Sequence, residues 1–353
     1  MKTHLKIVFI FLFLLPIIFF GQIPPGYYNG TSGLTGQALK FKLHDIISAN
    51  TNSLSYSDLW TAYNTTDKKS NGKVWDMYSD LPGGTSPYSF TFSTDQCGTY
   101  NSEADCYNRE HSVPASWFND AAPMYSDLFH VVPTDGYVNN RRSNYPFGEV
   151  GSVSWTSQNG SLLGTSSIPG YIGTVFEPID SFKGDFARIY FYMATRYKDE
   201  ISSWSSPSFS TSDLTTWTKN MMLEWNSLDP VSQKEVDRNN SVYTLQNNRN
   251  PYVDSVQWIN EIWGYPLNAV EFNNSKNYFV FPNPTIDILN INFDNLQGQS
   301  SFSIFSTDGK LLLTEKRVGG NHQINVKNFE RGLYFLVIEN HGKKFFEKIL
   351  LVK

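Results

Sequence analysis

The sequence predicts an α+β protein of two domains, because helix-like and strand-like patterns occupy different parts of the chain. Before residue 265, apolar side chains recur with helical spacing, whereas residues 278–353 contain short alternating runs separated by turns. The second pattern is typical of a small antiparallel β-sandwich. With 353 residues, the chain is long enough for both domains and for a sizeable core in the first.

The first 21 residues have the layout of a secretory signal peptide. Lys2 and Lys6 come first, the apolar run 7–15 follows, and Pro16 and Gly21 close the segment. A membrane anchor is the alternative, but the apolar run is short for a span and no second run follows it. We therefore expect an exported protein without a stable membrane span.

Residues 22–265 should form a domain with several helices. Four segments have apolar side chains at helical spacing, namely 34–47, 57–64, 182–198 and 214–228. A further helix should begin after Ser232, because Ser232 and Glu235 have the spacing of a capping box. Residues 74–79 predict a strand, and residues 148–173, rich in glycine, serine and threonine, predict short strands and loops.

Residues 266–277 form a mostly polar connection without periodicity, so we expect a linker there. In residues 278–353 the expected strands are 288–293, 301–306, 311–314 and 333–339. A short sandwich of this kind could also be an ordinary carbohydrate-binding or adhesion domain.

Cys97 and Cys106 are the two cysteines of the chain. In an exported protein, two cysteines nine positions apart are expected to form a disulfide. Free thiols and a zinc site are the alternatives. Zinc is disfavoured because no second cysteine or histidine pair stands at ligand spacing and no HExxH motif is present.

Two short segments hold the side chains best suited to catalysis. The first has Glu110 and His111 in succession, and the second has Asn139, Arg141 and Arg142. Carboxylate and amide oxygens suit Mg²⁺ or Ca²⁺, and a neutral imidazole can take a proton from water. Arginines can hold a phosphate, although twin arginines are also common as a solvated surface pair. Together these groups predict metal-assisted hydrolysis of phosphodiesters.

The charge distribution argues against a tight, sequence-specific DNA-binding protein. Residues 22–277 contain 17 Lys+Arg and 26 Asp+Glu, a net charge of −9, whereas residues 278–353 contain 9 and 7, a net charge of +2. A negative field slows association with a polyanion. A turnover enzyme tolerates this if its groove is locally positive, and the expected substrate-binding residues are Arg109, Arg141, Asn144 and Arg249.

Four blocks, in this order along the chain, resemble the bacterial secreted endonuclease I family. They are residues 108–118 (NREHSVPASWF), 127–148 (DLFHVVPTDGYVNNRRSNYPFG), 183–197 (KGDFARIYFYMATRY) and 246–254 (QNNRNPYVD). The resemblance extends over residues 35–265. It implies a ββα-metal (His-Me) finger with a helical surround, made of strands near 109–113 and 128–132 and a helix starting near Gly136.

Taken residue by residue, the resemblance implies His111 as the general base and Glu110 and Asn139 as ligands of one divalent ion, Mg²⁺ or else Ca²⁺ or Mn²⁺. Arg142 matches the family's arginine and would be catalytic. One position departs from the family's pattern. Phe129 stands where a histidine is often found, and His130 follows one place later.

The end of the chain resembles the type A sorting domain of the type IX secretion system. The resemblance is carried by residues 281–284 (FPNP), 332–334 (GLY) and 348–353. It implies a protein that interacts with the secretion machinery, crosses the outer membrane, and is then secreted or attached to the cell surface.

We therefore expect a secreted, metal-dependent, sequence-nonspecific endonuclease that acts as a monomer. Its expected substrate is DNA, or both DNA and RNA. A secreted ribonuclease of the same fold is one alternative, because no pattern in the sequence identifies a site for a 2′-hydroxyl group. The other is a non-catalytic protein that binds a polymer or mediates adhesion, in which Glu110, His111 and Asn139 would be dispensable.

Overall fold

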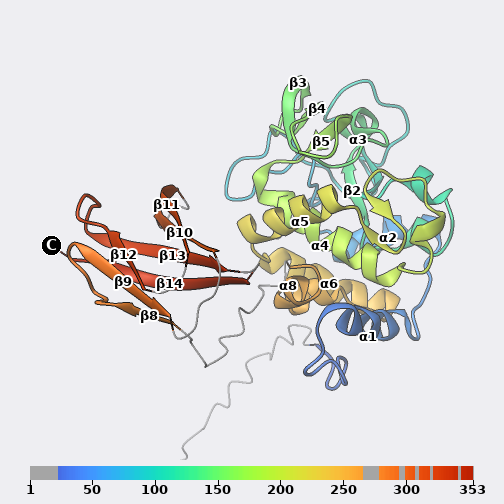
Figure 1. The fold of residues 1–353 in the computed structure, drawn as a ribbon. Coiled ribbons are helices and arrows are strands. Elements are labelled where there is room, and N and C mark those ends of the chain that lie inside the picture. The colour runs from blue at the N-terminus through green and yellow to red at the C-terminus, as the bar shows by residue number, and fades with distance from the viewer. Residues whose placement is uncertain are drawn as a thin grey trace, which may run out of the picture. The chain divides into compact units, whose positions relative to one another are not determined.

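The structure is a computed structural model that describes residues 23–264, 278–293, 299–306, 310–318, 321–340 and 343–352. The chain divides into two compact units, Met1–Gly264 and Tyr265–Lys353, each with its own hydrophobic core (Figure 1). The described part of the first unit mixes helices with antiparallel sheets, and that of the second is rich in strands, so the α+β class is confirmed. The expected signal peptide and linker lie outside the described residues.

The helices predicted from periodicity are confirmed, with ends that shift by a few residues. The α-helices are α1 (Gly36–Ser48), α2 (Leu59–Thr66), α3 (Gly136–Arg142), α4 (Asp180–Arg196), α5 (Thr216–Leu228), α6 (Gln233–Gln246), α7 (Pro251–Asp254) and α8 (Gln257–Ile262). The 3₁₀ turns are η1 (Tyr56–Asp58), η2 (Ala115–Phe118), η3 (Met124–Ser126) and η4 (Ile201–Ser203). The capping box of α6 is also present, since Ser232 and Glu235 each accept a hydrogen bond from the other's backbone N–H.

The sheets of the first unit are small and antiparallel. Its strands are β1 (Tyr107–His111), β2 (Val131–Asp135), β3 (Val150–Thr156), β4 (Leu162–Ser166), β5 (Thr174–Glu177), β6 (Phe209–Ser210) and β7 (Asp213–Leu214). They form the sheets β1-β2, β3-β4-β5 and β6-β7. Strands β3 and β4 confirm the short strands predicted between residues 148 and 173, and β5 adds a third strand just beyond that range.

The prediction of a strand at residues 74–79 is wrong, because residues 77–79 form a turn. The Asp76 carboxylate accepts hydrogen bonds from the backbone N–H of Tyr78 (2.8 Å) and from the hydroxyl of Ser79 (2.7 Å). Such local bonds from an aspartate replace the interstrand bonds of a sheet with a turn. The same carboxylate also accepts from the backbone N–H of Asp135 (2.9 Å), so the turn is anchored to the end of β2.

Helix α4 is the centre of the first unit's core. Every residue of α4 from Phe182 onward is buried, as expected of a helix enclosed by other elements. Helices α1 and α5 pack against it (Figure 1). The aromatic run 190–192 is fully buried, so it belongs to this core and offers no surface for stacking a base.

Strands β1 and β2 form a hairpin, and helix α3 begins directly after β2. Strands β1 and β2 pair antiparallel, with Glu110 opposite Val132 and His111 opposite Val131. The Asp135 carboxylate caps α3 by accepting from the N–H groups of residues 137 (2.8 Å) and 138 (2.9 Å). Strand β2 begins later than the predicted 128–132, because residues 127–131 form a hydrogen-bonded turn, in which the carbonyl of Asp127 accepts from two backbone N–H groups.

The described residues of the second unit form two antiparallel sheets. Its strands are β8 (Tyr278–Phe281), β9 (Ile288–Phe293), β10 (Gln299–Ser306), β11 (Leu311–Val318), β12 (His322–Asn325), β13 (Gly332–Asn340) and β14 (Lys343–Leu351). One sheet has the order β11-β10-β13-β14 and the other β12-β9-β8. Side chains from both sheets, such as Ile291 and Leu336, belong to one core, and the strands predicted in this region are present.

Cys97 and Cys106 form the predicted disulfide, with their Cα atoms 4.8 Å apart. The disulfide lies against the start of α3. The backbone N–H of Gly136 donates to the carbonyl of Cys106 (2.9 Å), and a Cβ atom at Gly136 would lie 2.4 Å from the Cys97 Sγ. The loop that precedes β1 is therefore in contact with the helix that follows β2.

We predict that Gly136→Ala destabilises the first unit. Because the added methyl group would overlap the Cys97 sulfur, either the disulfide loop or α3 must shift, at a cost of about 1–3 kcal/mol. The free energy of unfolding in urea measures this. Gly98→Ala, in the same loop, is the matched control, because nothing lies within 4 Å of its added Cβ. Equal stability of the two variants would contradict the packing described.

Candidate active site

Glu110 and Arg142 form a buried ion pair that joins β1 to α3. The two side chains are almost inaccessible to solvent, and the Arg142 Nη1 lies 2.6 Å from the Glu110 Oε1. The Tyr78 hydroxyl donates to the same carboxylate oxygen (2.7 Å). Burial raises the pKa of Glu110, while Arg142 and Tyr78 oppose the shift.

Arg142 also holds the end of β1 directly. Its guanidinium donates to the backbone carbonyls of His111 (2.8 Å) and Ser112 (2.6 Å). It faces Glu110 and these carbonyls, and it is fully buried. As placed, Arg142 orients the strand that carries Glu110 and His111.

Asn139 lies on the same side of the hairpin as Glu110. Its Nδ2 donates to the Asn108 Oδ1 (2.7 Å), and Asn108 stands two residues before Glu110 on β1. Side chains two apart on a strand share a face, so Asn108 and Glu110 both point toward α3. The two predicted metal ligands are therefore linked through Asn108, which lies beside Glu110 on β1 and bonds to Asn139 on α3.

His111 lies on the other face of β1, among aromatic rings. Its ring stacks with those of Tyr56 (centroids 5.6 Å apart) and Tyr125 (5.0 Å). Its Nε2 is 3.0 Å from the backbone carbonyl of Tyr125, which can only accept, so we assign the proton to Nε2 and leave Nδ1 as the basic nitrogen. Burial, followed by the neighbouring His130, lowers the pKa of His111 to about 3.

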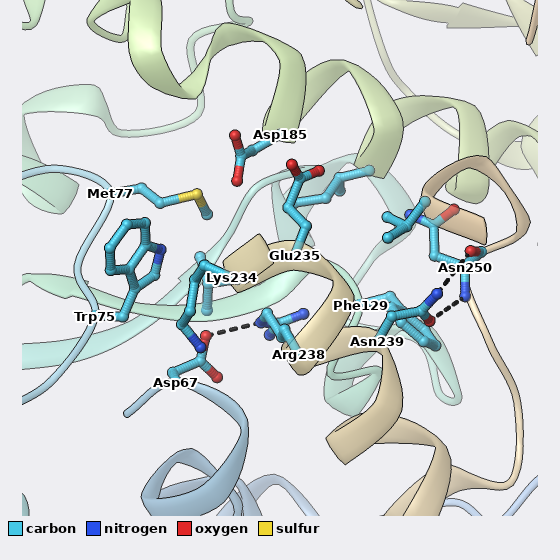
Figure 2. Close-up of a pocket in the computed structure, with 13 residues that line it drawn as sticks. Asp67, Trp75, Met77, Phe129, Asp185, Lys234, Glu235, Arg238, Asn239 and Asn250 are labelled. Carbon is cyan, nitrogen blue, oxygen red and sulfur yellow. Dashed lines mark hydrogen bonds and ion pairs between the residues drawn. The ribbon is translucent and has the colours of Figure 1, made fainter. Parts of the chain in front are cut away.

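Phe129 and His130 point to different sides of the turn that precedes β2. The ring of His130 lies 5.6 Å from that of His111, and its Nε2 is 2.6 Å from the carbonyl of Met124. Phe129 instead packs on Tyr192 (4.7 Å) and lines a cavity beside α6 (Figure 2). The residue that departs from the family's pattern therefore faces away from His111.

The cavity of Figure 2 is too small for a nucleotide. Its volume is about 40 Å³, room for about two or three water molecules. The Asp67–Arg238 ion pair and the Asn239–Asn250 hydrogen bonds line it (Figure 2). It contains none of the predicted site residues.

The four predicted substrate-binding residues are placed differently. Arg249 is buried and paired with Asp254 (2.6 Å), and none of its contacts involves the hairpin or α3. Asn144 is exposed just beyond α3. Arg109 lies on β1 and Arg141 on α3, so these two are close in sequence to the proposed ligands and base.

The donors at the hairpin suit a hard cation. Tyr78 and Arg142 both donate to the Oε1 atom of Glu110. Asn139 donates to Asn108 through its Nδ2 atom. The Glu110 Oε2 and the Asn139 Oδ1 therefore remain as oxygen donors of the kind that Mg²⁺ and Ca²⁺ take. No group of three or more His, Cys, Asp or Glu side chains in the described part of the chain could hold a metal, so water and substrate would complete the coordination.

Sequence reasoning missed Asn108, Tyr78, Tyr56 and Tyr125. The position of Asn108, two residues before Glu110 and directly before the predicted strand 109–113, was a signal that could have revealed it. The three tyrosines come from separate turns that reach the hairpin only in the folded chain, and no local pattern marks them. The oxygen donors, the neutral imidazole and the buried arginine together define a candidate hydrolytic site.

Comparison with known proteins identifies the family. A family model described as Endonuclease I matches residues 35–257, and one described as Secretion system C-terminal sorting domain matches residues 279–353. The chain therefore belongs to the endonuclease I family. It is a secreted nuclease with a sorting domain of the type IX system, and nucleases of this family generally depend on a divalent metal ion.

Curated relatives agree with this assignment. The chain is 33% identical over 259 residues to an extracellular ribonuclease of Bacillus subtilis (strain 168), covering 67% of this chain and 78% of the relative. An extracellular ribonuclease of Bacillus amyloliquefaciens is 34% identical over 253 residues, with the same coverage. Endonuclease-1 of Buchnera aphidicola subsp. Baizongia pistaciae (strain Bp) is 30% identical over 130 residues, 37% of this chain and 46% of the relative.

The described helices give no candidate for a membrane span, since none combines the required length with sufficient apolar character. The substrate of a nuclease is nucleic acid, and the sorting domain implies contact with the secretion machinery.

We predict that His130 makes the fold sensitive to acid. Burial lowers its pKa from 6.5 to about 4, so as the pH falls below 6.5 the unfolded chain takes up a proton that the folded chain does not. The free energy of unfolding is therefore unaffected by His130 above pH 6.5. It decreases as the pH falls, by about 2 kcal/mol at pH 5. In urea unfolding, the free energy of unfolding of His130→Gln should decrease less between pH 6.5 and 5 than that of the parent protein. An equal decrease in the two proteins would contradict this prediction.

Proposed function

We propose that this protein is a metal-dependent, sequence-nonspecific endonuclease whose hairpin and α3 form a ββα-metal finger. The observation that supports this best is the pair of contacts between β1 and α3, in which Arg142 bonds to Glu110 and Asn139 bonds to Asn108, two residues before Glu110. It brings a carboxylate and an amide oxygen to one face of the hairpin, beside the strand position of His111. No other described cluster offers these groups together.

Glu110 and Asn139 would hold one divalent ion, with Mg²⁺ the best candidate and Ca²⁺ or Mn²⁺ as alternatives. When bound, the ion would neutralise charge on the phosphate as the bond to the leaving oxygen breaks. Arg142 favours the ionised form of Glu110 and fixes its position, because its guanidinium opposes the burial that raises the pKa of this carboxyl. We assign Arg142 to positioning, since its Nη1 and Nη2 groups donate within the protein and its buried Nε has no described partner.

His111 would be the general base that accepts a proton from the attacking water. Tyr125 fixes the tautomer through its carbonyl, and the rings of Tyr56 and Tyr125 fix the plane of the imidazole. The lowered pKa keeps His111 neutral, and so able to accept a proton, at any pH near 7. A phosphodiester anion beside the ring would raise this pKa toward the working range.

The substrate would be DNA, RNA or both. Two relatives named extracellular ribonuclease support RNA, and those named Endonuclease-1 leave DNA open. The protein would act as a monomer outside the cell or at its surface. A purely adhesive role is not favoured by any described feature, because it gives no reason for the Glu110–Arg142–Asn139 arrangement.

We predict that His111→Ala lowers the rate of hydrolysis by on the order of 10²–10⁴ while the protein stays folded, because the variant lacks the imidazole that accepts the proton of the attacking water. Initial rates on matched DNA and RNA, with Mg²⁺ and with a chelator, measure the base, the metal and the substrate preference together. Parent-like turnover by a folded His111→Ala variant would exclude this base. Full activity in the chelator would exclude the metal.

We also predict that a chain ending near Asn274 keeps full nuclease activity. The two cores share no residue, and the predicted ligands and base all lie in the first unit. In a native host that uses type IX secretion, the same shortened chain should remain inside the cell. A folded but inactive shortened protein would mean that the second unit takes part in binding nucleic acid.

A further inference from the structure

Most arginines of the first unit are already neutralised. Of the seven arginines in residues 23–264, five are paired with a carboxylate: Arg142 with Glu110, Arg188 with Glu235, Arg196 with Asp127, Arg238 with Asp67, and Arg249 with Asp254. Arg109 and Arg141 have no carboxylate partner among the described residues. In a region with a net charge of −9, a cation without a partner needs an explanation.

Arg109 is held rigidly between two aromatic rings. Its guanidinium carbon lies 3.6 Å from the centre of the Tyr56 ring and 4.5 Å from that of Trp60. Its Nη1 donates to the backbone carbonyl of Tyr56 (2.7 Å). The Nε and Nη2 groups have no described hydrogen-bond partner, so one edge of a preoriented guanidinium remains available.

Arg141 has a similar environment on α3. Its guanidinium carbon lies 5.1 Å from the ring of Tyr137 and 5.7 Å from that of Trp155 on β3. Its Nε and Nη2 both donate to the Tyr137 hydroxyl (3.1 and 2.7 Å). The Nη1 group has no described partner, and the side chain is exposed.

The two arginines flank the hairpin and α3. Arg109 is two residues before His111 and shares its face of β1, and Tyr56 stacks on both side chains. On α3, residues 137 and 141 are four apart and so lie on one side of the helix, whereas Asn139 lies on the opposite side. Arg109 therefore lies beside the proposed base on β1, and Arg141 lies on the helix that carries the proposed ligand Asn139.

We propose that Arg109 and Arg141 are phosphate clamps that hold one nucleic-acid strand on either side of the phosphodiester that is hydrolysed. The proposal rests on the proposed nuclease site. Stacking on Tyr56 fixes Arg109, and two hydrogen bonds to the Tyr137 hydroxyl fix Arg141. Neither contact neutralises the guanidinium, so its free N–H groups can donate to phosphate oxygens. Because phosphates are the same at every nucleotide, the clamps read neither base nor sugar, which accounts for nonspecific cleavage.

The test is the salt dependence of binding. Affinity for a labelled oligothymidylate is measured with a chelator present, from about 50 to 200 mM salt, for Arg109→Ala, Arg141→Ala and the double variant. Each single variant should reduce the slope of log K against log salt by about 0.7, and the double variant by about 1.4. With metal added, each single variant should raise KM and leave kcat unchanged.

Matched variants separate the clamps from a diffuse charge effect. Lys219→Ala removes another cation that has no described carboxylate partner but also no aromatic contact, and it should leave the slope unchanged. Arg109→Lys and Arg141→Lys keep the charge, so they should keep the slope while binding more weakly. If Arg109→Ala does not fold, Arg109→Gln is measured in its place.

An unchanged slope in the folded arginine variants would overturn the proposal, and so would an equal loss in Lys219→Ala. Failure of the nuclease proposal has a different outcome, in which the parent protein shows the full salt slope but hydrolyses neither DNA nor RNA when metal is added.

Discussion

The buried pair of Glu110 and Arg142 is the interaction on which the rest of the site depends. Arg142 neutralises the carboxylate and binds the carbonyls of His111 and Ser112, so a single guanidinium fixes both α3 and the end of β1. Removing one partner of such a pair leaves an uncompensated buried charge, which typically destabilises a protein by about 3–5 kcal/mol. Position and stability at this site are therefore set by the same contacts.

The start of α3 is held as firmly as its end. The Asp135 carboxylate caps the helix, the Asp76 carboxylate accepts from the Asp135 backbone, and the disulfide packs on Gly136. A helix of seven residues is too short to be stable alone, so these contacts must supply its order. Because both ends are fixed, the position of Asn139 relative to Glu110 depends little on motion of the surrounding loops.

Sequence patterns predicted the elements better than they predicted the contacts. Helical spacing gave α1, α4 and α5 because each buries one or more apolar faces on the core, and alternation gave the strands of the second unit. The strand expected at 74–79 failed because the Asp76 side chain competes for backbone hydrogen bonds. The motif marked Glu110 and Asn139, yet which arginine pairs with which carboxylate depends on tertiary packing.

The pairing of the arginines also explains how an acidic protein can act on a polyanion. Five guanidinium groups are paired with buried carboxylates, so each pair has no net charge and adds little to the field at the surface. At physiological salt, exposed charges more than about 8 Å apart are largely screened from one another, which reduces the repulsion from the remaining acidic surface. Direct contacts at Arg109 and Arg141 act within that distance. A net charge of −9 therefore limits how fast nucleic acid is captured from afar, while binding at the hairpin depends on the few cations that the fold leaves without a carboxylate.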